Sequence, residues 1–386
     1  MRDAVIVDAV RTAVGKGKPG GALSGIHPTD LSAHVLKALA ERNGLDPGTV
    51  DDVIWGCVSQ VGEQAGSIGR YAVLAAGWPE HVPGLTIDRQ CGSSQQAVHQ
   101  AAAGVIAGQY DIAIAGGVES MSRVPMGSTR ADGKYGEPYG TLVAERYDNY
   151  RFNQGIGAEM IAEEFGLTRE ELDQHALDSH ARAARAVDEG RFKSQITPVT
   201  LADGTVFDTD EGVRRGGTLE AMAGLKTPFK ADGVVSAGNA SQISDGSAAL
   251  LVTTSDIAAR NGWTPIARFH TGVVTGVDPV TMLKGPIPAT RKALERSGLG
   301  VGDIGAFEIN EAFASVSLGW QRQTGADYQR MNPNGGAMAL GHPLGGSGAR
   351  LMTTLVHHMR DNGIRYGLQS MCEGGGMANA TVLELV

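Results

Sequence analysis

The sequence has 386 residues, enough for two or three domains at roughly 100–200 residues each. Hydrophobic residues make up 42% and charged residues 19%, which favours a buried core over a disordered chain. The net charge of −9 disfavours a nucleic-acid surface, and no apolar run approaches the ~18 residues of a membrane span. The N-terminus has no basic stretch followed by an apolar one, so we expect no secretory signal.

The cysteines Cys57, Cys91 and Cys372 lie far apart in the sequence. Their spacing excludes a CxxC zinc or redox pair, and their odd number disfavours a disulfide framework. We therefore expect a reducing cytosol and no bound metal. Cys57 follows Trp55 and Gly56 in an apolar run and is interpreted as a core residue.

Strand-like and helix-like segments alternate through the first 118 residues. Thr29 and Asp30 offer an N-cap to a helix that runs to about Asn43 and is closed by Gly44. Alternation of this kind predicts a mostly parallel sheet covered by helices. The expected strands are 4–10, 53–55, 85–87 and 112–115, and the other expected helices are 67–76 and 93–107.

The same order recurs about 255 residues later. Segment 37–54, a helix that leads through glycine into a strand, resembles segment 292–309. The offset also brings Cys91 close to His342. These matches predict an internal duplication into two similar α/β halves, in which the two residues would face one another. Chance similarity of helix–glycine–strand units is the alternative.

Residues 119–236 do not fit the alternation. Helical patterns cover 157–165 and 168–190, and Thr168 with Glu171 forms a capping box for the second of these. We interpret the region as an inserted subdomain that shapes a binding site. The expected division of the chain is 1–118 with 243–263 for the first half, 119–242 for the insertion and 264–386 for the second half.

Cys91 stands at a strand-to-helix junction, in DRQCGSS. The amides and the positive dipole end of the helix behind it would favour the thiolate, the nucleophilic form. An inert buried cysteine is equally compatible with this segment. His342 lies in the glycine-rich segment 335–348, where it could act as a base or a hydrogen-bond donor. A lone histidine is more often structural, but the duplication favours a role beside Cys91.

Cys372 precedes Glu373 and the glycine run 374–376, whose accessible N–H groups suit an oxyanion hole. A second thiol there could shuttle a proton, or it could simply end a strand. Asn310 follows a strand and could orient a water or cap a helix. Segment 212–230 holds four basic side chains that fit either phosphate binding or a solvated face: Arg214, Arg215, Lys226 and Lys230.

Four motifs are specific in combination: QCGSSQQA at 90–97, NEAF at 310–313, GGAMALGHPLGGSG at 335–348 and CEGGG at 372–376. Through them the sequence resembles the thiolases, which are acetyl-CoA acyltransferases and acetyltransferases, over essentially its whole length. The resemblance implies an α/β thiolase fold: two pseudo-symmetric αβαβα layered halves, an inserted loop domain, and an active site where the halves meet. It also implies a homo-oligomer, commonly a tetramer built of tight dimers. No permanently bound cofactor is implied, with coenzyme A and acyl-CoA as substrates.

The resemblance assigns a role to each motif residue. Cys91 matches the nucleophile that becomes acylated, and His342 matches the residue that activates this thiol. With a water held by Asn310, His342 also stabilises the thioester oxyanion. Cys372 matches the acid/base that handles the α-carbon proton of acetyl-CoA. The backbone N–H groups of Cys91 and Gly374 match the second oxyanion hole.

For coenzyme A, the resemblance points to the inserted domain and to the segment NASQISDG. Arg214 lies where a family arginine approaches the nucleotide, and Ser241 matches a serine near the pantetheine amide. Met282 is retained before Gly285 and Pro286. The expected apolar walls are Phe229, Ala237 and Phe313.

The sequence departs from the family pattern at two places. Ser94 stands where many thiolases have the second glycine of CGSG. Acetoacetyl-specific members usually carry His-Met before a Gly-x-x-Ala-Glu segment, and this chain has Asn153 and Gln154 there. The wording DRQCGSSQQA and MCEGGG is most similar to bacterial thiolases of fatty-acid and sterol catabolism. This similarity and the lack of a targeting segment predict a bacterial cytoplasmic enzyme.

The leading hypothesis is CoA-dependent thiolytic cleavage of a 3-ketoacyl-CoA to acetyl-CoA and a shortened acyl-CoA, a reversible Claisen condensation through a Cys91 acyl-enzyme. One alternative is an acetoacetyl-CoA thiolase that makes the C4 product. Another, from a different class, is a catalytically silent thiolase-like protein that binds acyl-CoA or lipid. The intact set of Cys91, His342, Asn310 and Cys372 argues against the silent binder.

Overall fold

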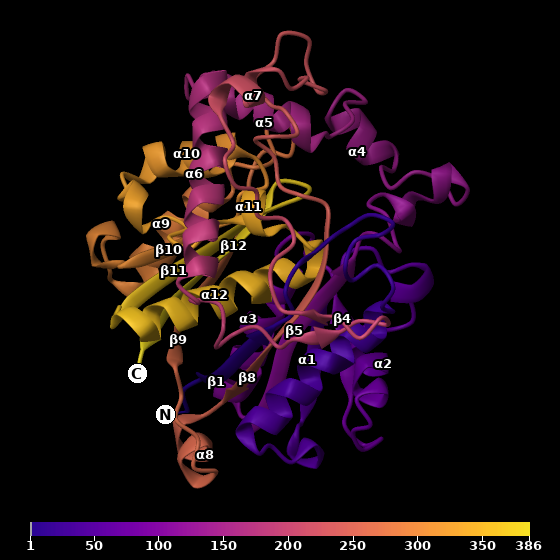
Figure 1. The fold of residues 1–386 in the computed structure, drawn as a ribbon, viewed down its shortest axis with the longest axis vertical. Helices are drawn as coiled ribbons and strands as arrows, with labels where there is room; N and C mark the ends of the chain where they lie inside the picture. The colour runs from indigo at the N-terminus through magenta and orange to yellow at the C-terminus, as the bar shows by residue number, and fades with distance from the viewer. Residues whose placement is uncertain (1) are drawn as a thin grey trace.

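A computed structural model describes residues 2–386 and places one mixed ten-stranded sheet at the centre of the molecule (Figure 1). The strand order is β10-β11-β12-β9-β1-β8-β5-β3-β4, and β2 pairs with β8. The strands are β1 (Val5–Arg11), β2 (Gly15–Lys16), β3 (Asp52–Gly56), β4 (Gly84–Ile87), β5 (Ile112–Ser120), β8 (Ser244–Thr253), β9 (Ala267–Gly276), β10 (Ala306–Ile309), β11 (Tyr366–Glu373) and β12 (Met377–Leu385).

Helices cover the sheet on both faces, and a separate group of helices lies in the region between β5 and β8 (Figure 1). Those that pack on the sheet are α1 (Pro28–Asn43), α2 (Ile68–Ala75), α3 (Ser93–Ala107), α8 (Ser255–Arg260), α9 (Pro286–Ser297), α10 (Ala314–Thr324) and α12 (Ser347–Asn362). The short α11 (Ala337–Leu340) precedes the His342 loop.

The predicted duplication is present in the sheet. The series β3-β5-β8-β1 and β10-β11-β12-β9 have the same order, and their successive pairings are parallel, antiparallel and antiparallel in both. The two series meet where β1 pairs with β9, at Ile6 and Ala267. The chain therefore builds two similar α/β halves related across this seam.

The expectation of a mostly parallel sheet is wrong. Only β3–β4, β3–β5 and β10–β11 pair in parallel within the described residues, and the other ladders of this sheet are antiparallel. A tight glycine turn at 374–376 returns the chain from β11 to β12, which makes these neighbours antiparallel. Strands covered on both faces are apolar in either direction, so hydrophobicity does not reveal the difference.

The first helix begins earlier than expected. His27, not Thr29 or Asp30, is the N-cap, because its Nδ1 accepts from the amide of Thr29 at 3.2 Å and Pro28 takes the first helical position. The predicted end is confirmed: Gly44 follows α1 in the left-handed conformation, at φ 56°.

Five layers follow from the alternation of side chains along the strands. On β5, Ile112 and Ile114 pack with α1 and α2 on the outer face. Ala113 and Ala115 of the same strand point the other way, into a cluster formed with α3 and α12. The second half repeats the arrangement with α9 and α10 outside. The two halves of the sheet thus lie on either side of α3 and α12. The layers are outer helices, the first half of the sheet, α3 with α12, the second half of the sheet, and outer helices, as the αβαβα expectation requires.

The segment between β5 and β8 carries its own helices, which lie at the top of Figure 1. They are α4 (Thr141–Arg146), α5 (Gln154–Glu164), α6 (Arg169–Asp188) and α7 (Leu219–Ala223). The predicted capping box at the start of α6 is confirmed, because Thr168 and Glu171 hydrogen-bond to each other's amide groups.

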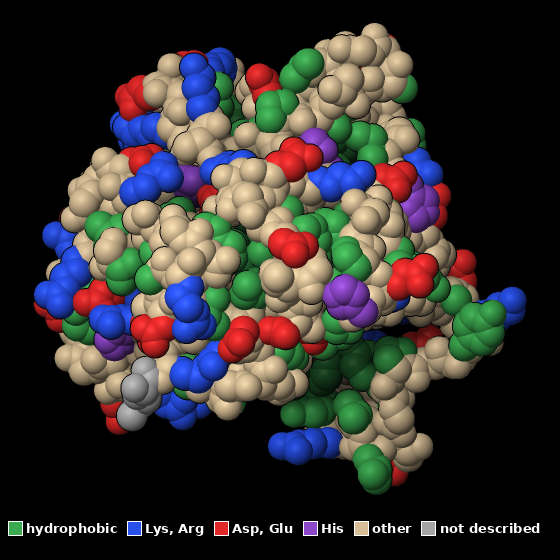
Figure 2. Space-filling model, turned by 90° about the horizontal axis from the view of Figure 1, so that it is seen from below, with side chains coloured by type: hydrophobic (Ala, Val, Ile, Leu, Met, Phe, Trp, Pro, Cys, Tyr) green, Lys and Arg blue, Asp and Glu red, His purple; other side chains and the backbone are tan. Residues whose placement is uncertain are grey.

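Positive and negative side chains are interspersed on the face shown in Figure 2. Within residues 2–386, no helix has both the length and the apolar composition needed to cross a membrane.

The two halves also meet where α3 crosses α12. The amide of Ala349 donates to Oγ of Ser94 at 2.8 Å. A Cβ on Gly348 would overlap the backbone amide of Gln95. Glycine at position 348 is therefore what allows the two backbones to approach this closely.

Gly348→Ala should lower the free energy of unfolding by about 1–3 kcal/mol, because the added methyl group overpacks the crossing. This loss should appear although alanine itself favours a helix by about 1 kcal/mol over glycine. Chemical denaturation followed by circular dichroism measures the change. Gly25→Ala is the matched control, since a Cβ there meets no atom within 4 Å. Equal effects in the two variants would contradict the proposed constraint.

Candidate active site

Cys91 and His342 lie in the loops that precede the two crossing helices. Cys91 is buried and packs against Met121 and Leu344. The backbone amide of His342 donates to Oγ of Ser244 at 3.0 Å, and the amide of Ser244 donates to Sδ of Met121 at 3.5 Å. Met121 and Ser244 thus connect the two loops, and the structure brings Cys91 and His342 into one buried region.

Cys372 and Asn310 form a second pair beside this region. Cys372 lies on β11 and is fully buried, and Asn310 follows the neighbouring strand β10. Nδ2 of Asn310 donates to Sγ of Cys372 at 3.5 Å. Burial raises the pKa of Cys372 to about 11, while the bond from Asn310 acts in the opposite direction. A charge on Cys372 also raises the pKa of Cys91, so the two thiols share one poorly solvated environment.

The expected effect of helix α3 does not by itself make Cys91 a thiolate in the free protein. Burial raises the pKa of Cys91 well above its ordinary value, and negative charge at Cys372 and Glu373 raises it further. The helix does begin at Ser93, as expected. A helix end contributes only about 0.3–2 kcal/mol, which is less than the desolvation of a fully buried anion.

His342 is a neutral imidazole whose tautomer is set by Ser347. Burial lowers its pKa to about 3, and positive charge on Arg350 acts in the same direction. Nδ1 lies 2.6 Å from Oγ of Ser347, and this hydroxyl donates to the carbonyl of Pro343 at 2.9 Å. Because the hydroxyl has one proton, Ser347 must accept from Nδ1–H, which leaves the lone pair on Nε2. Nε2 has no hydrogen-bond partner among the described residues, so it is free to accept a proton.

Two buried carboxylates that the sequence analysis missed hold the His342 loop. Glu119, at the end of β5, accepts from the amide of Gly345 at 2.8 Å and from three further donors near Val58. Glu311 accepts from Oγ of Ser179 at 2.7 Å and from the amide of Met338 at 3.3 Å. The NEAF motif could have identified Glu311 from the sequence. Glu119 lies at the end of a buried strand and belongs to none of the four motifs.

Gly374 opens the turn between β11 and β12 and lies beside the Cys91 loop. A Cβ on Gly374 would lie 2.8 Å from Oε1 of Gln90. The amide of Gly374 donates no hydrogen bond to another residue within 2–386. Oδ1 of Asn310 is also buried without a partner in this range. Both groups are available to a ligand.

Four of the residues predicted to contact coenzyme A gather beside Cys372. Met282 and Phe313 are buried in one cluster with this cysteine. The rings of Phe229 and Phe313 meet edge to face with centroids 6.0 Å apart. The amide of Ser241 donates to the carbonyl of Ala312, next to Phe313, at 2.9 Å.

The other two predicted residues, Arg214 and Ala237, are exposed on the segment between β5 and β8. The amide of Arg214 donates to Nδ1 of His180 at 3.0 Å. Of the basic side chains nearby, Arg215 pairs with Asp188 at 2.7 Å and Lys230 pairs with Glu163 at 3.2 Å. These two are therefore part of a solvated face. Cys57 is fully buried, which confirms its assignment to the core.

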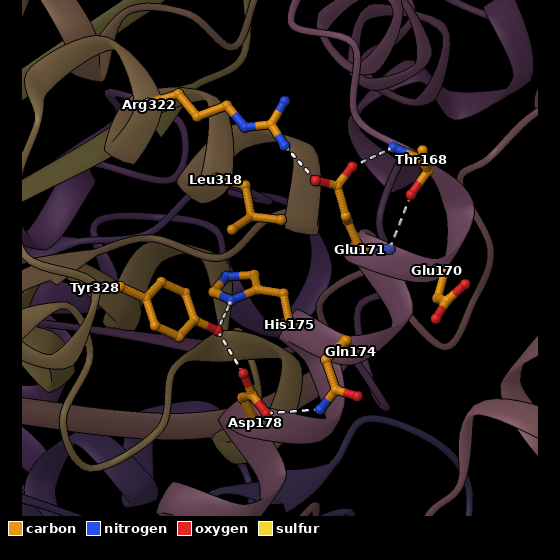
Figure 3. A pocket seen from close by; sticks show the side chains of 9 residues that line it. All are labelled: Thr168, Glu170, Glu171, Gln174, His175, Asp178, Leu318, Arg322 and Tyr328. Carbon is orange, nitrogen blue, oxygen red and sulfur yellow. Dashed lines mark hydrogen bonds and ion pairs between the residues drawn. The ribbon is translucent and has the colours of Figure 1, made fainter.

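Two open cavities lie outside this region. One of about 590 Å³ adjoins Gly375 and Gly376 and is flanked by Arg146 and Tyr147 at the end of α4. Another of about 480 Å³ lies between α6 and α10 (Figure 3). Most of its polar side chains are bonded to one another, as in the chain from His175 through the hydroxyl of Tyr328 to Asp178.

The fold, together with Cys91 and Cys372 in one buried region, is that of a class of acyltransferases. Family models described as thiolase N-terminal domain and thiolase C-terminal domain match residues 4–256 and 263–385. Among curated relatives, Steroid 3-ketoacyl-CoA thiolase FadA6 of Mycobacterium tuberculosis is 48% identical, with 100% of this chain and 94% of the relative covered. Beta-ketoadipyl-CoA thiolase of Escherichia coli is 45% identical, and both chains are covered completely.

Among solved structures, the acetyl-CoA acetyltransferase of Bacillus anthracis superposes with a TM-score of 0.92 at 39% identity, covering 100% of this chain and 99% of that one. The chain belongs to the thiolase family.

Ser347→Ala should lower kcat by about 10- to 100-fold, because Nδ1–H loses its acceptor and the tautomer with a free Nε2 is no longer favoured. Thr353→Ala is the matched control, since this hydroxyl of α12 also donates to the carbonyl four residues earlier, that of Ala349, but makes no bond to His342. Steady-state kinetics of both variants checks the effect. An unchanged kcat in Ser347→Ala would contradict the assigned tautomer.

Proposed function

We propose that this chain cleaves 3-ketoacyl-CoA with coenzyme A, giving acetyl-CoA and an acyl-CoA shortened by that unit. The observation that carries the proposal is the buried site itself. Two thiols share it, and His342 is neutral with an unpartnered Nε2. Such a site holds a nucleophile, a base and a second proton carrier together, which are the groups that this reaction needs.

In the proposed first half-reaction, Nε2 of His342 takes the proton of the Cys91 thiol. The thiolate attacks the 3-keto carbon, and the bond from that carbon to the α-carbon breaks. The electron pair of the broken bond goes to the α-carbon, which takes a proton from Cys372 and leaves as acetyl-CoA. Cys91 is now acylated, and Cys372 is a thiolate.

In the proposed second half-reaction, the Cys372 thiolate takes the proton of the incoming coenzyme A thiol. The coenzyme A sulfur attacks the thioester on Cys91, and the sulfur of Cys91 leaves with the proton held by His342. Both cysteines and the histidine return to their starting protonation states. The high pKa of Cys372 suits its role as the base, because a thiol that holds its proton tightly becomes a strong base once that proton is lost.

Negative charge on the reacting oxygens requires preorganised donors. We assign the amides of Cys91 and Gly374 to one oxyanion. We assign the other oxyanion to protonated His342 and to a water molecule held by Asn310. The free amide of Gly374 and the unpartnered Oδ1 of Asn310 support these assignments.

We assign the coenzyme A site to the insertion, residues 119–242. In this division the first half consists of 1–118 with 243–263, and the second half consists of 264–386. Arg214 is assigned to the nucleotide, Ser241 to the pantetheine amide, and the apolar walls to Phe229, Ala237, Phe313 and Met282. The edge-to-face contact of Phe229 with Phe313 supports an apolar wall beside Cys372. No metal or resident cofactor is assigned a role.

We propose a cytoplasmic homo-oligomer, a dimer or a dimer of dimers. The segment from Met126 to Tyr150 supports it, because this segment exposes large hydrophobic side chains that a partner subunit would cover. They are Met126, Tyr135, Leu142, Val143 and Tyr150.

An acetoacetyl-CoA thiolase is the second candidate, since the similar structure from Bacillus anthracis bears the name acetyl-CoA acetyltransferase. The relatives named for steroid and β-ketoadipyl substrates favour larger acyl groups instead. Asn153, which replaces the histidine of acetoacetyl-specific members, caps α5 by accepting from the amides of Gly155 and Ile156.

Thiolysis can be followed by loss of the magnesium–enolate absorbance of the substrate. The long-chain 3-ketoacyl-CoA should be cleaved faster than acetoacetyl-CoA. Cys91→Ala should lower the rate by at least about 10⁴-fold with an unchanged circular dichroism spectrum. Cys57→Ala is the control cysteine and should retain most of the activity, because Glu119, 4.0 Å from this thiol, keeps its bond to the amide of Gly345.

Preference for acetoacetyl-CoA would replace the proposal with the C4 enzyme. Cleavage of neither substrate, with coenzyme A still bound, would favour a silent binder. Full activity in Cys91→Ala would overturn the assigned nucleophile.

A further inference from the structure

Glu373, between Cys372 and the glycine turn, is a buried acidic side chain that the proposed reaction does not use. It is fully buried, and neither carboxyl oxygen has a hydrogen-bond partner among the described residues. Buried polar groups are normally satisfied, as Glu119 and Glu311 are in this same site. An unsatisfied carboxyl group next to a nucleophile therefore requires an explanation.

The strand geometry points this carboxyl at the Cys91 loop. Side chains alternate along β11, so Glu373 shares a face with Met371, and Met371 belongs to the same buried cluster as Cys91. A Cβ on Gly92 would overlap Oε1 of Glu373 and would lie 2.8 Å from Nδ2 of Asn379. Nδ2 of Asn379 also donates to the carbonyl of Gly92 at 3.0 Å. The residue after the nucleophile is thus held between two side chains of the β11–β12 hairpin.

The charged groups around the carboxyl are few. The loop before α3 contributes Asp88 and Arg89, and Nε of Arg89 is itself buried without a partner in the described range. Strand β11 contributes Cys372, and β12 contributes the uncharged Asn379. Burial raises the pKa of Glu373 to about 8, with Arg89 opposing and Asp88 adding to the shift. The group is therefore largely a neutral carboxylic acid at neutral pH.

A neutral and an ionised Glu373 affect the nucleophile differently. Negative charge on Glu373 raises the pKa of Cys91, because two anions in a poorly solvated site repel each other. A protonated Glu373 exerts no such repulsion. The coupling is reciprocal, so a thiolate at Cys91 also opposes ionisation of Glu373.

We propose that Glu373 is a positioning residue whose carboxyl group, packed behind Gly92, controls the ionisation of Cys91. As an acid it permits the thiolate to form when His342 takes the proton. As a carboxylate it opposes formation of the thiolate, and this limits the reactivity of Cys91 at alkaline pH. This inference rests on the proposed role of Cys91, but its test requires no turnover.

The test measures alkylation of Cys91 by iodoacetamide in the complete protein from about pH 6 to about pH 10, the range in which a thiol and a raised carboxyl titrate. Peptide mass spectrometry reports Cys91 separately from Cys57 and Cys372. Glu373→Gln should be alkylated at Cys91 on the order of tenfold faster than the wild type above about pH 8, equivalent to a fall of about one unit in the pKa of the thiol.

Two further variants make the outcome decisive. Glu373→Met removes the same charge with an apolar side chain and should shift the profile in the same direction. Asp52→Asn is the matched control, a carboxyl of the same sheet that bonds to Tyr110 at 3.0 Å, and its Cys91 profile should coincide with the wild type.

Superimposable profiles for the wild type and both Glu373 variants would overturn the proposal, as would an equal shift in Asp52→Asn. A failed thiolysis assay alone would challenge the proposed function and leave this alkylation result unaffected.

Discussion

The site depends on the close crossing of α3 and α12. Each helix is preceded by a loop that carries one of the reactive side chains, Cys91 or His342. The two loops meet where the helices approach closely, with Ser94 bonded to Ala349 and the α-carbon of Gly348 against the backbone of Gln95. Small side chains on the facing strands make room for this pair of helices. A duplicated fold thus places one loop from each half at a single point.

Burial is the second constraint, since it sets the resting charge of every reactive group. The thiols of Cys91 and Cys372 have raised pKa values, and His342 has a lowered one. These three reacting groups are therefore neutral in the free protein. Charge appears only when a proton moves between these groups, which is when preorganised donors stabilise it most effectively. The carboxylates Glu119 and Glu311 hold the His342 loop in the position that this transfer requires.

Much of this arrangement follows from the sequence. The helix end at Gly44 and the capping box at Thr168 are local patterns, and the duplicated order is a repeat in the sequence. The structure bears out all three. Strand direction does not follow, because strands covered on both faces look alike whichever way they run. The N-cap at His27 was missed because the favoured residue types stand two positions later. Long-range effects were missed as well: burial raises the pKa of Cys91, and Cys372 and Glu373, which are distant in sequence, raise it further.

The most direct measurement is the site of acylation. The protein would be incubated with acetyl-CoA alone, quenched in acid, and mapped by peptide mass spectrometry. We expect one acetyl group on the peptide that contains Cys91, none on the peptide that contains Cys372, and release of coenzyme A in equal amount. Acetylation of Cys372 instead, or binding of acetyl-CoA without any covalent adduct, would contradict the account.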